Sequence, residues 1–223
     1  LEAMGYTTLG EALEGTLGFR TNRDHAYEGL AVRGLYLLGD QNTRVLILLD
    51  GHALNNPAEV GSSKVGQDFG IPLARIERIE VVRGPASSLH GNNAFLGMVN
   101  IVTKRQEGEG FSLAAGVLGS TRREGTLWAD AGGSLGSARW SLLAQGFQRP
   151  GDTLEVPALG PSSLPRELDR EEAQGAYLRL HGPGWSFRGQ ALSRTQGLAT
   201  APFGTTLGDP STRYRNRVLS GDL

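Results

Sequence analysis

Cysteine is absent from the 223 residues, so the chain forms neither a disulfide framework nor a thiolate metal site. Long hydrophobic runs are also missing, since the longest, Val45–Leu49, has only the length of a strand. A membrane-spanning helix needs roughly 18 apolar residues, so spanning by helices is excluded, whereas crossing by alternating strands remains open. The N-terminus lacks the basic start and apolar core of a signal peptide, which indicates either a cytoplasmic protein or a numbering that begins inside a mature chain.

A charge excess of either sign is missing as well. The chain has 22 Lys and Arg against 23 Asp and Glu, for a net charge of −1, and no basic stripe of the kind that nucleic-acid binding requires. Motifs for a serine nucleophile, a phosphate loop or a dinucleotide are absent, and the four histidines lack metal-ligand spacing. The sequence therefore predicts no nucleic-acid partner, no metal, no cofactor and no catalysis.

Glycine, by contrast, is abundant, with 33 residues, which favours many short strands and tight turns. The first hundred residues read as mixed α/β. A capping box at Thr8 and Glu11 opens a helix that includes Leu17 and is ended by Gly18. The strand and helix segments expected after it are 30–34, then 44–54 with a tight Asp-Gly turn, then 71–84 with a helical turn before its strand, a short helix opened by Pro85, and 98–104.

After residue 110 almost every segment alternates polar and apolar residues with a period of two. One face of the first such segment carries Phe111, Leu113, Ala115 and Val117. The six strands expected are about 111–118, 123–132, 138–148, 174–182, 184–194 and 214–223. Several have the roughly 9–11 residues that cross a bilayer at a tilt.

The connections between these strands sort by length. Two long polar connections fall at the same end of the expected meander as the connection after residue 118, while the two short turns fall at the other end. Outer-membrane barrels show this asymmetry, whereas a soluble sandwich has no reason to. Because a membrane barrel needs at least about eight strands, the chain is expected to be the N-terminal part of a longer protein.

The ordered set of "VRG", "LLDG", "RIEVVRGPASSLHGNNAFLG" and "VNIVTK" resembles the plug domain of TonB-dependent outer-membrane receptors, over residues 7 to 105. Residues after 111 resemble the family's barrel of about 22 strands only in their alternation of polar and apolar residues, and not in any motif. The resemblance implies an α+β plug domain inside a transmembrane antiparallel β-barrel, with the plug at 1–107 and the first barrel strands at 108–223. It also implies a Gram-negative type outer-membrane location, where the protein contacts outer-membrane lipid.

The resemblance implies ligand-gated import of a scarce solute, such as a siderophore or another metal chelate, or cobalamin. The partner that supplies energy is TonB of the inner-membrane complex, whose binding box precedes the plug. Arg33 and Arg83 match family arginines that lock the plug to carboxylates of the barrel wall. A buried arginine requires such a partner, whereas the alternative is a pair of solvated arginines at strand ends.

In related receptors the loops after "VRG" and "LDG" touch ligand. The matching polar and aromatic residues here are Tyr36, Asp40, Gln41, Asn42, His52, Asn55 and Asn56. Four glycines are expected to supply turns and close backbone approaches, which glycine alone permits: Gly51, Gly84, Gly91 and Gly97. Asn92 and Asn93 are expected to bind buried backbone groups where no regular ladder exists.

Three other interpretations remain open at this point. The first is a soluble carbohydrate- or protein-binding module made of an α/β domain and a β-sandwich. The second is a soluble hydrolase that uses Ser87 or Ser88. The third is a receptor that also signals to a regulator through an additional domain upstream of Leu1.

Overall fold

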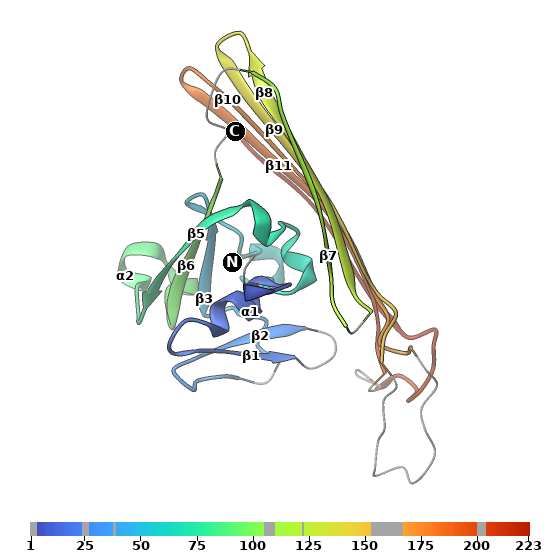
Figure 1. Cartoon of the computed structure of the whole chain (residues 1–223). Coiled ribbons are helices and arrows are strands. Elements are labelled where there is room, and N and C mark those ends of the chain that lie inside the picture. The colour runs from blue at the N-terminus through green and yellow to red at the C-terminus, as the bar shows by residue number, and fades with distance from the viewer. Residues whose placement is uncertain are drawn as a thin grey trace. The chain divides into compact units, whose positions relative to one another are not determined.

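The structure is a computed structural model that describes residues 4–23, 27–37, 39–104, 110–121, 123–152, 167–199 and 204–223. It divides into two compact units, residues 1–105 and residues 106–223 (Figure 1). The domain boundary expected at residues 107 and 108 lies outside the described residues. Each unit has its own sheets.

The N-terminal unit contains a two-stranded and a four-stranded sheet. Its helices and strands are α1 (Leu9–Glu14), β1 (Phe19–Arg23), β2 (Glu28–Val32), β3 (Val45–Leu49), β4 (His52–Ala53), β5 (Ile76–Arg83), α2 (Ser87–His90) and β6 (Gly97–Thr103). Short 3-10 turns are η2 (Pro57–Glu59), η3 (Gln67–Phe69), η4 (Leu73–Arg75) and η5 (Asn92–Ala94). Strands β1 and β2 pair with each other, and the larger sheet has the order β4-β3-β6-β5, in which only β3 and β6 are parallel.

The core of this unit lies along the two central strands of the larger sheet. Ile47 of β3 and Val99 and Ile101 of β6 are fully buried, as the near-continuous apolar sequence of both strands predicts. Ala86, the N-cap of α2, and Ala94, the last residue of η5, pack in a cluster with Leu46 of β3. The glycine-rich segment between β5 and β6 is therefore packed onto the sheet through its small residues.

The predicted capping box is confirmed, but the helix that it opens is shorter than expected. The Glu11 N–H donates to Thr8 Oγ1, and the Glu11 carboxylate accepts from the Thr8 N–H. The helix ends at Glu14, because the Gly15 N–H closes its last turn on the Leu13 carbonyl. The expected extension to Leu17 is wrong: Leu17 is 83% exposed, and Gly18, with φ of 93°, turns the chain into β1.

The C-terminal unit is one six-stranded antiparallel sheet, which confirms the six predicted strands within a few residues. The strands are β7 (Ser112–Gly119), β8 (Gly125–Leu135), β9 (Ala138–Arg149), β10 (Glu171–Gly182), β11 (Trp185–Gly197) and β12 (Arg213–Asp222). Each pairs with its neighbour in the chain, so the unit is a plain meander. Only residues 136–137 and 183–184 connect the strands at one end, which we call the short-turn end. The other end, the long-loop end, carries residues 150–170 and 198–212.

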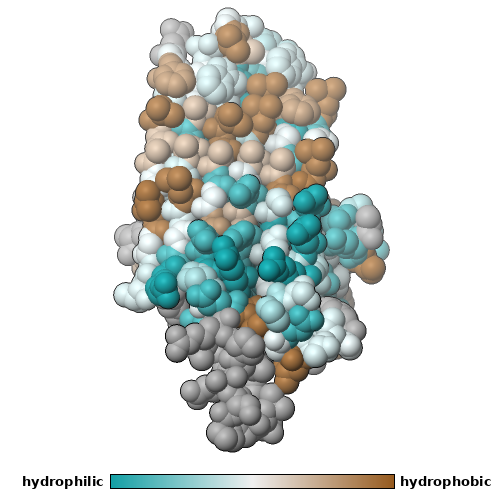
Figure 2. Space-filling model, turned by 90° about the vertical axis from the view of Figure 1, so that its right-hand side faces the viewer, coloured by the Kyte–Doolittle hydropathy of each residue, from teal (hydrophilic) through white to brown (hydrophobic). Residues whose placement is uncertain are grey.

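The two faces of this sheet differ in polarity, and the exposed face is the apolar one. A row of alanines, each paired with the next across the ladder, runs over one face: Ala115, Ala129, Ala144, Ala176 and Ala191. Leu113, Val117 and Leu127 share this outer face and are 61% to 79% exposed. The inner face, which carries the alternate residues, buries polar groups such as Arg194 and Gln196. Figure 2 shows the outer face, with apolar residues over its upper part.

Candidate functional site

The two predicted lock arginines lie beside each other at one end of the N-terminal unit. Arg33 follows β2, and its Nη2 donates to the backbone carbonyl of Arg83, the last residue of β5, at 3.0 Å. Arg83 Nη1 donates to the Leu17 carbonyl at 3.2 Å. Both side chains are exposed, and within the described ranges neither guanidinium forms an ion pair. Their pairing with barrel-wall carboxylates stays a prediction.

Glycine is required for different local reasons at the four positions predicted to need it. Gly51, Gly84 and Gly91 have φ of 87°, 128° and 84°, a region that L-residues rarely adopt. Gly97 forms no turn, contrary to the expectation, because it is the first residue of β6. A Cβ there would lie 2.9 Å from the Val82 carbonyl oxygen, so the position demands a close approach between two backbones.

The Asp-Gly turn after β3 is fixed to the last residue of β6. Asp50 accepts from both the N–H and the hydroxyl of Thr103, at 2.9 and 2.7 Å. The Gly51 N–H donates to Asn100 Oδ1 at 3.0 Å. His52, which was predicted to face ligand, is exposed immediately after this turn. It therefore lies at the C-terminal end of β3.

Asn42 lies at the opposite end of β3 and is buried. Its Oδ1 accepts from the Leu30 N–H at 2.6 Å, and its Nδ2 donates to the carbonyls of Glu28 and Ser63 at 3.1 and 3.0 Å. Its backbone adopts φ of 61°, a left-handed conformation that asparagine tolerates better than most residues. These bonds join β2, the start of β3 and the segment after η2. We therefore assign Asn42 a structural role instead of ligand contact.

Asn55 and Asn93 have similar structural roles, because both donate to the same backbone carbonyl. Asn55 Nδ2 and Asn93 Nδ2 lie 2.8 and 3.0 Å from the Gly61 oxygen. Asn55 also binds the backbone of β3 through Val45 and Ile47, and Asn93 donates to the Thr43 carbonyl at 2.7 Å. The expectation that an asparagine of the glycine-rich segment binds backbone groups is confirmed for Asn93. That segment is thus tied to β3 and is not a free loop.

A pocket of about 170 Å³ gathers three of the seven predicted ligand residues, including the already described Asn42. Tyr36, Asp40 and Asn42 line it together with Arg44 and Phe95. Asp40 accepts from the Thr43 N–H at 2.9 Å and lies 3.8 Å from Arg44 Nε. The pocket has apolar walls and an acid–base pair, a combination suited to one end of a polar organic molecule.

The last two predicted ligand residues lie away from the lining of this pocket. Gln41 accepts from Lys64 Nζ at 2.8 Å. Asn56 makes a backbone bridge to Ser62. The structure thus brings together part of the predicted group and separates His52 from it by the length of β3.

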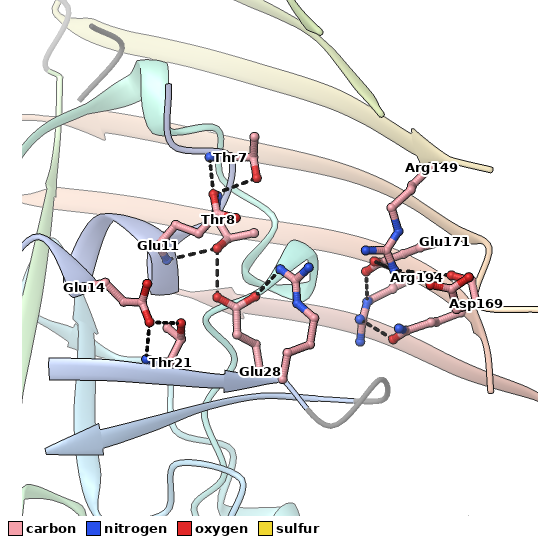
Figure 3. A network of polar contacts seen from close by, with 12 residues as sticks. Thr7, Thr8, Glu11, Glu14, Thr21, Glu28, Arg149, Asp169, Glu171 and Arg194 are labelled. Carbon is pink, nitrogen blue, oxygen red and sulfur yellow. Dashed lines mark hydrogen bonds and ion pairs between the residues drawn. The ribbon is translucent and has the colours of Figure 1, made fainter. Parts of the chain in front are cut away.

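Glu28 was missed by the sequence analysis and is a buried carboxylate at the start of β2 (Figure 3). Its Oε1 accepts from Thr8 Oγ1 at 2.9 Å, and its Oε2 binds Arg23 Nη2 at 3.0 Å. Burial raises the pKa of Glu28, and the Arg23 charge, the Arg23 hydrogen bond and the Thr8 hydrogen bond only partly oppose this. In the sequence "YEGLAV" this glutamate looks like an ordinary polar residue at the start of a strand. Its hydrogen bond with Thr8, the N-cap of α1, was therefore not evident from the sequence.

A second buried polar cluster lies on the inner face of the six-stranded sheet, towards its long-loop end (Figure 3). Glu171 of β10 binds Arg194 Nε at 2.7 Å and Arg149 Nη2 at 3.3 Å. Arg149 also donates to the Asp169 carbonyl at 3.3 Å, and Asp169 accepts from the Asp152 N–H at 2.8 Å. Two arginines and two carboxylates thus fix the ends of the connection between β9 and β10. The signal was present in the alternation, which places Arg149, Glu171 and Arg194 on one face.

Residues 1–98 match the TonB-dependent Receptor Plug Domain family. This part of the chain is a TonB-dependent receptor plug domain. The match includes every strand of the plug domain up to the beginning of β6, with Arg33, Arg83 and the pocket described above. The predicted family resemblance is therefore confirmed.

Solved receptor structures share the fold of the plug domain and of the strands after it. The ferric enterobactin receptor PfeA from Pseudomonas aeruginosa, as its R480A mutant with enterobactin, is 17% identical over 96% of this chain, with a TM-score of 0.62. The pyoverdine receptor FpvA from Pseudomonas aeruginosa PAO1 is 14% identical over 86%, with a TM-score of 0.61. The copper transporter OprC is 14% identical over 85%, with a TM-score of 0.62. The chain covers only 36%, 26% and 29% of these receptors, respectively.

Two negative findings complete the description. Among the described residues, no group of three or more His, Asp or Glu side chains is arranged to hold a metal ion. In the same residues, no helix combines the length and hydrophobicity needed to cross a membrane.

Proposed function

We propose that the protein is an outer-membrane receptor that imports a scarce solute by TonB-coupled transport. Residues 1–107 would form the plug, and residues 108–223 the first strands of a transmembrane barrel. A siderophore or similar metal chelate, or cobalamin, is the ligand class that this proposal includes. The solved relatives named above are receptors or transporters for ferric enterobactin, pyoverdine and copper.

The observation that carries this proposal is the inverted polarity of the six-stranded sheet. Its outer face exposes Leu113, Val117, Leu127 and Leu219, which are 61% to 87% exposed, around the row of alanines. Its inner face buries the ion pairs of Glu171 with Arg149 and Arg194, next to a few apolar side chains such as Leu143 and Leu192. In water, such a face would leave a large apolar patch exposed, whereas lipid favours an apolar exterior with a polar interior.

Aromatic side chains at one end of the outer face support the same interpretation. Phe111 and Trp140 lie with their ring centroids 6.3 Å apart, and Trp185 and Phe187 lie on the same face beside the other short turn. Transmembrane barrels carry aromatic girdles where the apolar band meets the lipid headgroups. Because outer-membrane barrels have their short turns on the periplasmic side, the short-turn end would lie at the periplasmic interface.

The plug residues fit separate tasks in this scheme. Arg33 and Arg83 present guanidinium groups whose only bonds within the described residues go to backbone carbonyls, which leaves donors for wall carboxylates. The pocket at Tyr36 and Asp40 would contact part of the ligand. TonB would act on a segment preceding the plug, so ligand contact and energy input would reach the same small domain.

The alternative of a soluble binding module does not account for which face of the six-stranded sheet is buried. A β-sandwich would bury the alanine row and expose the alternate face, which is the reverse of the observed burial. For the hydrolase, Ser87 and Ser88 lie in α2, and among the described residues no base forms a hydrogen bond with either hydroxyl. The proposal of a signalling receptor depends on residues upstream of Leu1.

Membrane fractionation of cells that express the full-length protein tests the proposal. We expect the protein in the outer-membrane fraction, extracted by detergent and not by high salt or osmotic shock. Release of the full-length protein without detergent would overturn it. Growth of a deletion strain on siderophores, cobalamin or copper as limiting nutrient would then identify the solute, with a TonB-deficient strain as the control for energy coupling.

A further inference from the structure

Strand β12 carries arginine at every second position at its long-loop end. Arg213, Arg215 and Arg217 are all exposed, and the strand period places them on one face. The register assigns this face to the apolar exterior, because Leu219, two residues further along, pairs with Ala191 of the alanine row. We call these three residues the arginine ladder. Within the described part of the chain none of their guanidinium groups has a hydrogen bond or an ion pair.

The neighbours of the ladder on β11 are small and uncharged. Arg217 lies opposite Ser193, and Arg215 lies opposite Thr195. One strand further, Glu172 provides the single carboxylate on this face of β9 to β12 within the described residues, and it already pairs with Arg170. Figure 2 shows the apolar part of the face passing into a hydrophilic band towards the long-loop end.

Three guanidinium groups about 7 Å apart on one strand face repel each other, and a bound anion relieves this repulsion. Guanidinium groups bind phosphate in a bidentate manner and are weakly hydrated, which suits them to an interface. The adjacent apolar face accommodates the acyl chains of the same molecule. An anion that joins phosphate to acyl chains matches both parts of the surface, whereas a soluble anion matches only one.

We propose that the arginine ladder binds the phosphate groups of membrane-lipid headgroups at the long-loop end of the barrel. This inference depends on the proposed membrane location and adds a lipid site to it. The ladder lies on the exterior of the sheet, so the site is separate from the plug pocket and from solute transport. The class of ligand is a phosphorylated lipid whose headgroup lies level with Arg213 to Arg217.

Native mass spectrometry of the full-length protein in detergent tests the ladder, with bis-phosphorylated lipid A, its monophosphoryl form and inorganic phosphate as probes. Three variants of the full-length protein are compared: R213Q/R215Q/R217Q, the charge-preserving R213K/R215K/R217K, and R20Q, an exposed arginine of the plug. We expect the affinity for lipid A to fall about five-fold per arginine in the Gln variant. The Lys variant should retain most of the binding, and R20Q all of it.

The wild-type protein should bind the bis-phosphorylated lipid more tightly than the monophosphoryl form, and added salt should weaken this preference. The proposal would be overturned if the wild type bound both lipids equally or if the Gln variant bound lipid A as tightly as the wild type. Binding of inorganic phosphate but of neither lipid would also overturn it. A lowered melting temperature with unchanged lipid binding would also overturn it, since the arginines would then pair with protein carboxylates. The single variant R217Q tests the same preference should the triple variant fail to fold.

Failure of the proposed function gives a different result. In that case the full-length protein leaves the membrane fraction without detergent, irrespective of the ladder. If only the lipid site is wrong, the protein remains in the outer membrane and all variants bind the two forms of lipid A alike.

Discussion

The side-chain oxygen of Asn42 accepts a hydrogen bond from the backbone N–H of Leu30 at 2.6 Å. This bond connects the small β1–β2 sheet to the start of β3, and the Asn42 amide nitrogen extends the connection to Ser63. Since β1 and β2 pair only with each other, side chains such as Asn42 contribute much of their attachment to the larger sheet.

Replacement of Asn42 should therefore loosen β2. N42A removes two donors and one acceptor that bind buried backbone groups, so we expect the plug to lose about 2–4 kcal/mol of stability. N42G, which tolerates the left-handed backbone, should lose nearly as much if the hydrogen bonds dominate. Hydrogen exchange at the Leu30 amide in the full-length protein measures the effect. The exposed Asn92 gives the control N92A, and equal protection of Leu30 in all variants would rule out the assigned role.

The stability of the plug should depend on pH in opposite directions at two glutamates. Burial raises the pKa of Glu28 above its model-peptide value of 4.5, so its protonated form favours the folded state. Its stabilising effect is complete below pH 4.5 and is lost as the pH rises through the folded pKa. E28Q should therefore gain in melting temperature relative to the wild type between about pH 4.5 and 7.

Glu14 provides the matched comparison, because hydrogen bonds from the side chain and backbone of Thr21 lower its pKa below 4.5. Its contribution is present above pH 4.5 and is lost as the pH falls through the folded pKa. E14Q should lower the melting temperature at neutral pH and have no effect at acid pH. Parallel pH profiles for E28Q and E14Q would contradict the assignment of burial as the dominant cause at Glu28.

Gly97 should tolerate no side chain, although its backbone is ordinary. A Cβ would lie 2.9 Å from the Val82 carbonyl oxygen, and neither β5 nor β6 can move away without loss of their ladder. We expect G97A to cost about 1–3 kcal/mol in chemical unfolding. Gly146 of β9 has no atom within 4 Å of the corresponding Cβ, so G146A is the strand control and should change stability by less than about 1 kcal/mol. Similar values for the two variants would disprove the close-approach argument.

The lock hypothesis predicts that Arg33 and Arg83 act together on retention of the plug. In the full-length protein, R33A/R83A should raise the rate of protease cleavage within the plug at least about tenfold, since wall carboxylates would lose both partners. R20A, at an exposed site of β1, should leave the rate unchanged. Additive small effects of R33A and R83A, equal to that of R20A, would show that the two arginines are merely solvated strand ends.

The six strands of the second unit were predictable because their outer faces carry apolar residues at every second position, and this alternation appears directly in sequence. The order of the plug elements was predictable for a different reason, since buried β3 and β6 are apolar on both faces. Strand β1 was missed because only Phe19 in it is buried, which leaves no pattern to recognise. The helix end was misplaced because Gly15 ended α1 before Gly18.

Side-chain roles in the plug were harder to predict than its strands. Asn42, Asn55 and Tyr36 look alike as polar or aromatic loop residues, yet Asn55 binds only backbone, Tyr36 lines a pocket, and Asn42 does both. Which backbone group lacks a ladder partner depends on how β2 and β3 pack, and no local pattern contains that information. The partnership of Thr8 with Glu28 crosses 20 residues for the same reason.

The double hydrogen bond from Thr103 to Asp50 gives the plug two mechanically unequal ends. Strand β6 has a neighbour on each side, and its last residue is fastened to the β3 turn, so traction there must shear several bonds at once. The β1–β2 hairpin forms a sheet of its own and can peel away bond by bond. A pull from the N-terminus would thus separate the β1–β2 hairpin first, while the hydrogen bonds that hold β6 in the larger sheet stayed intact.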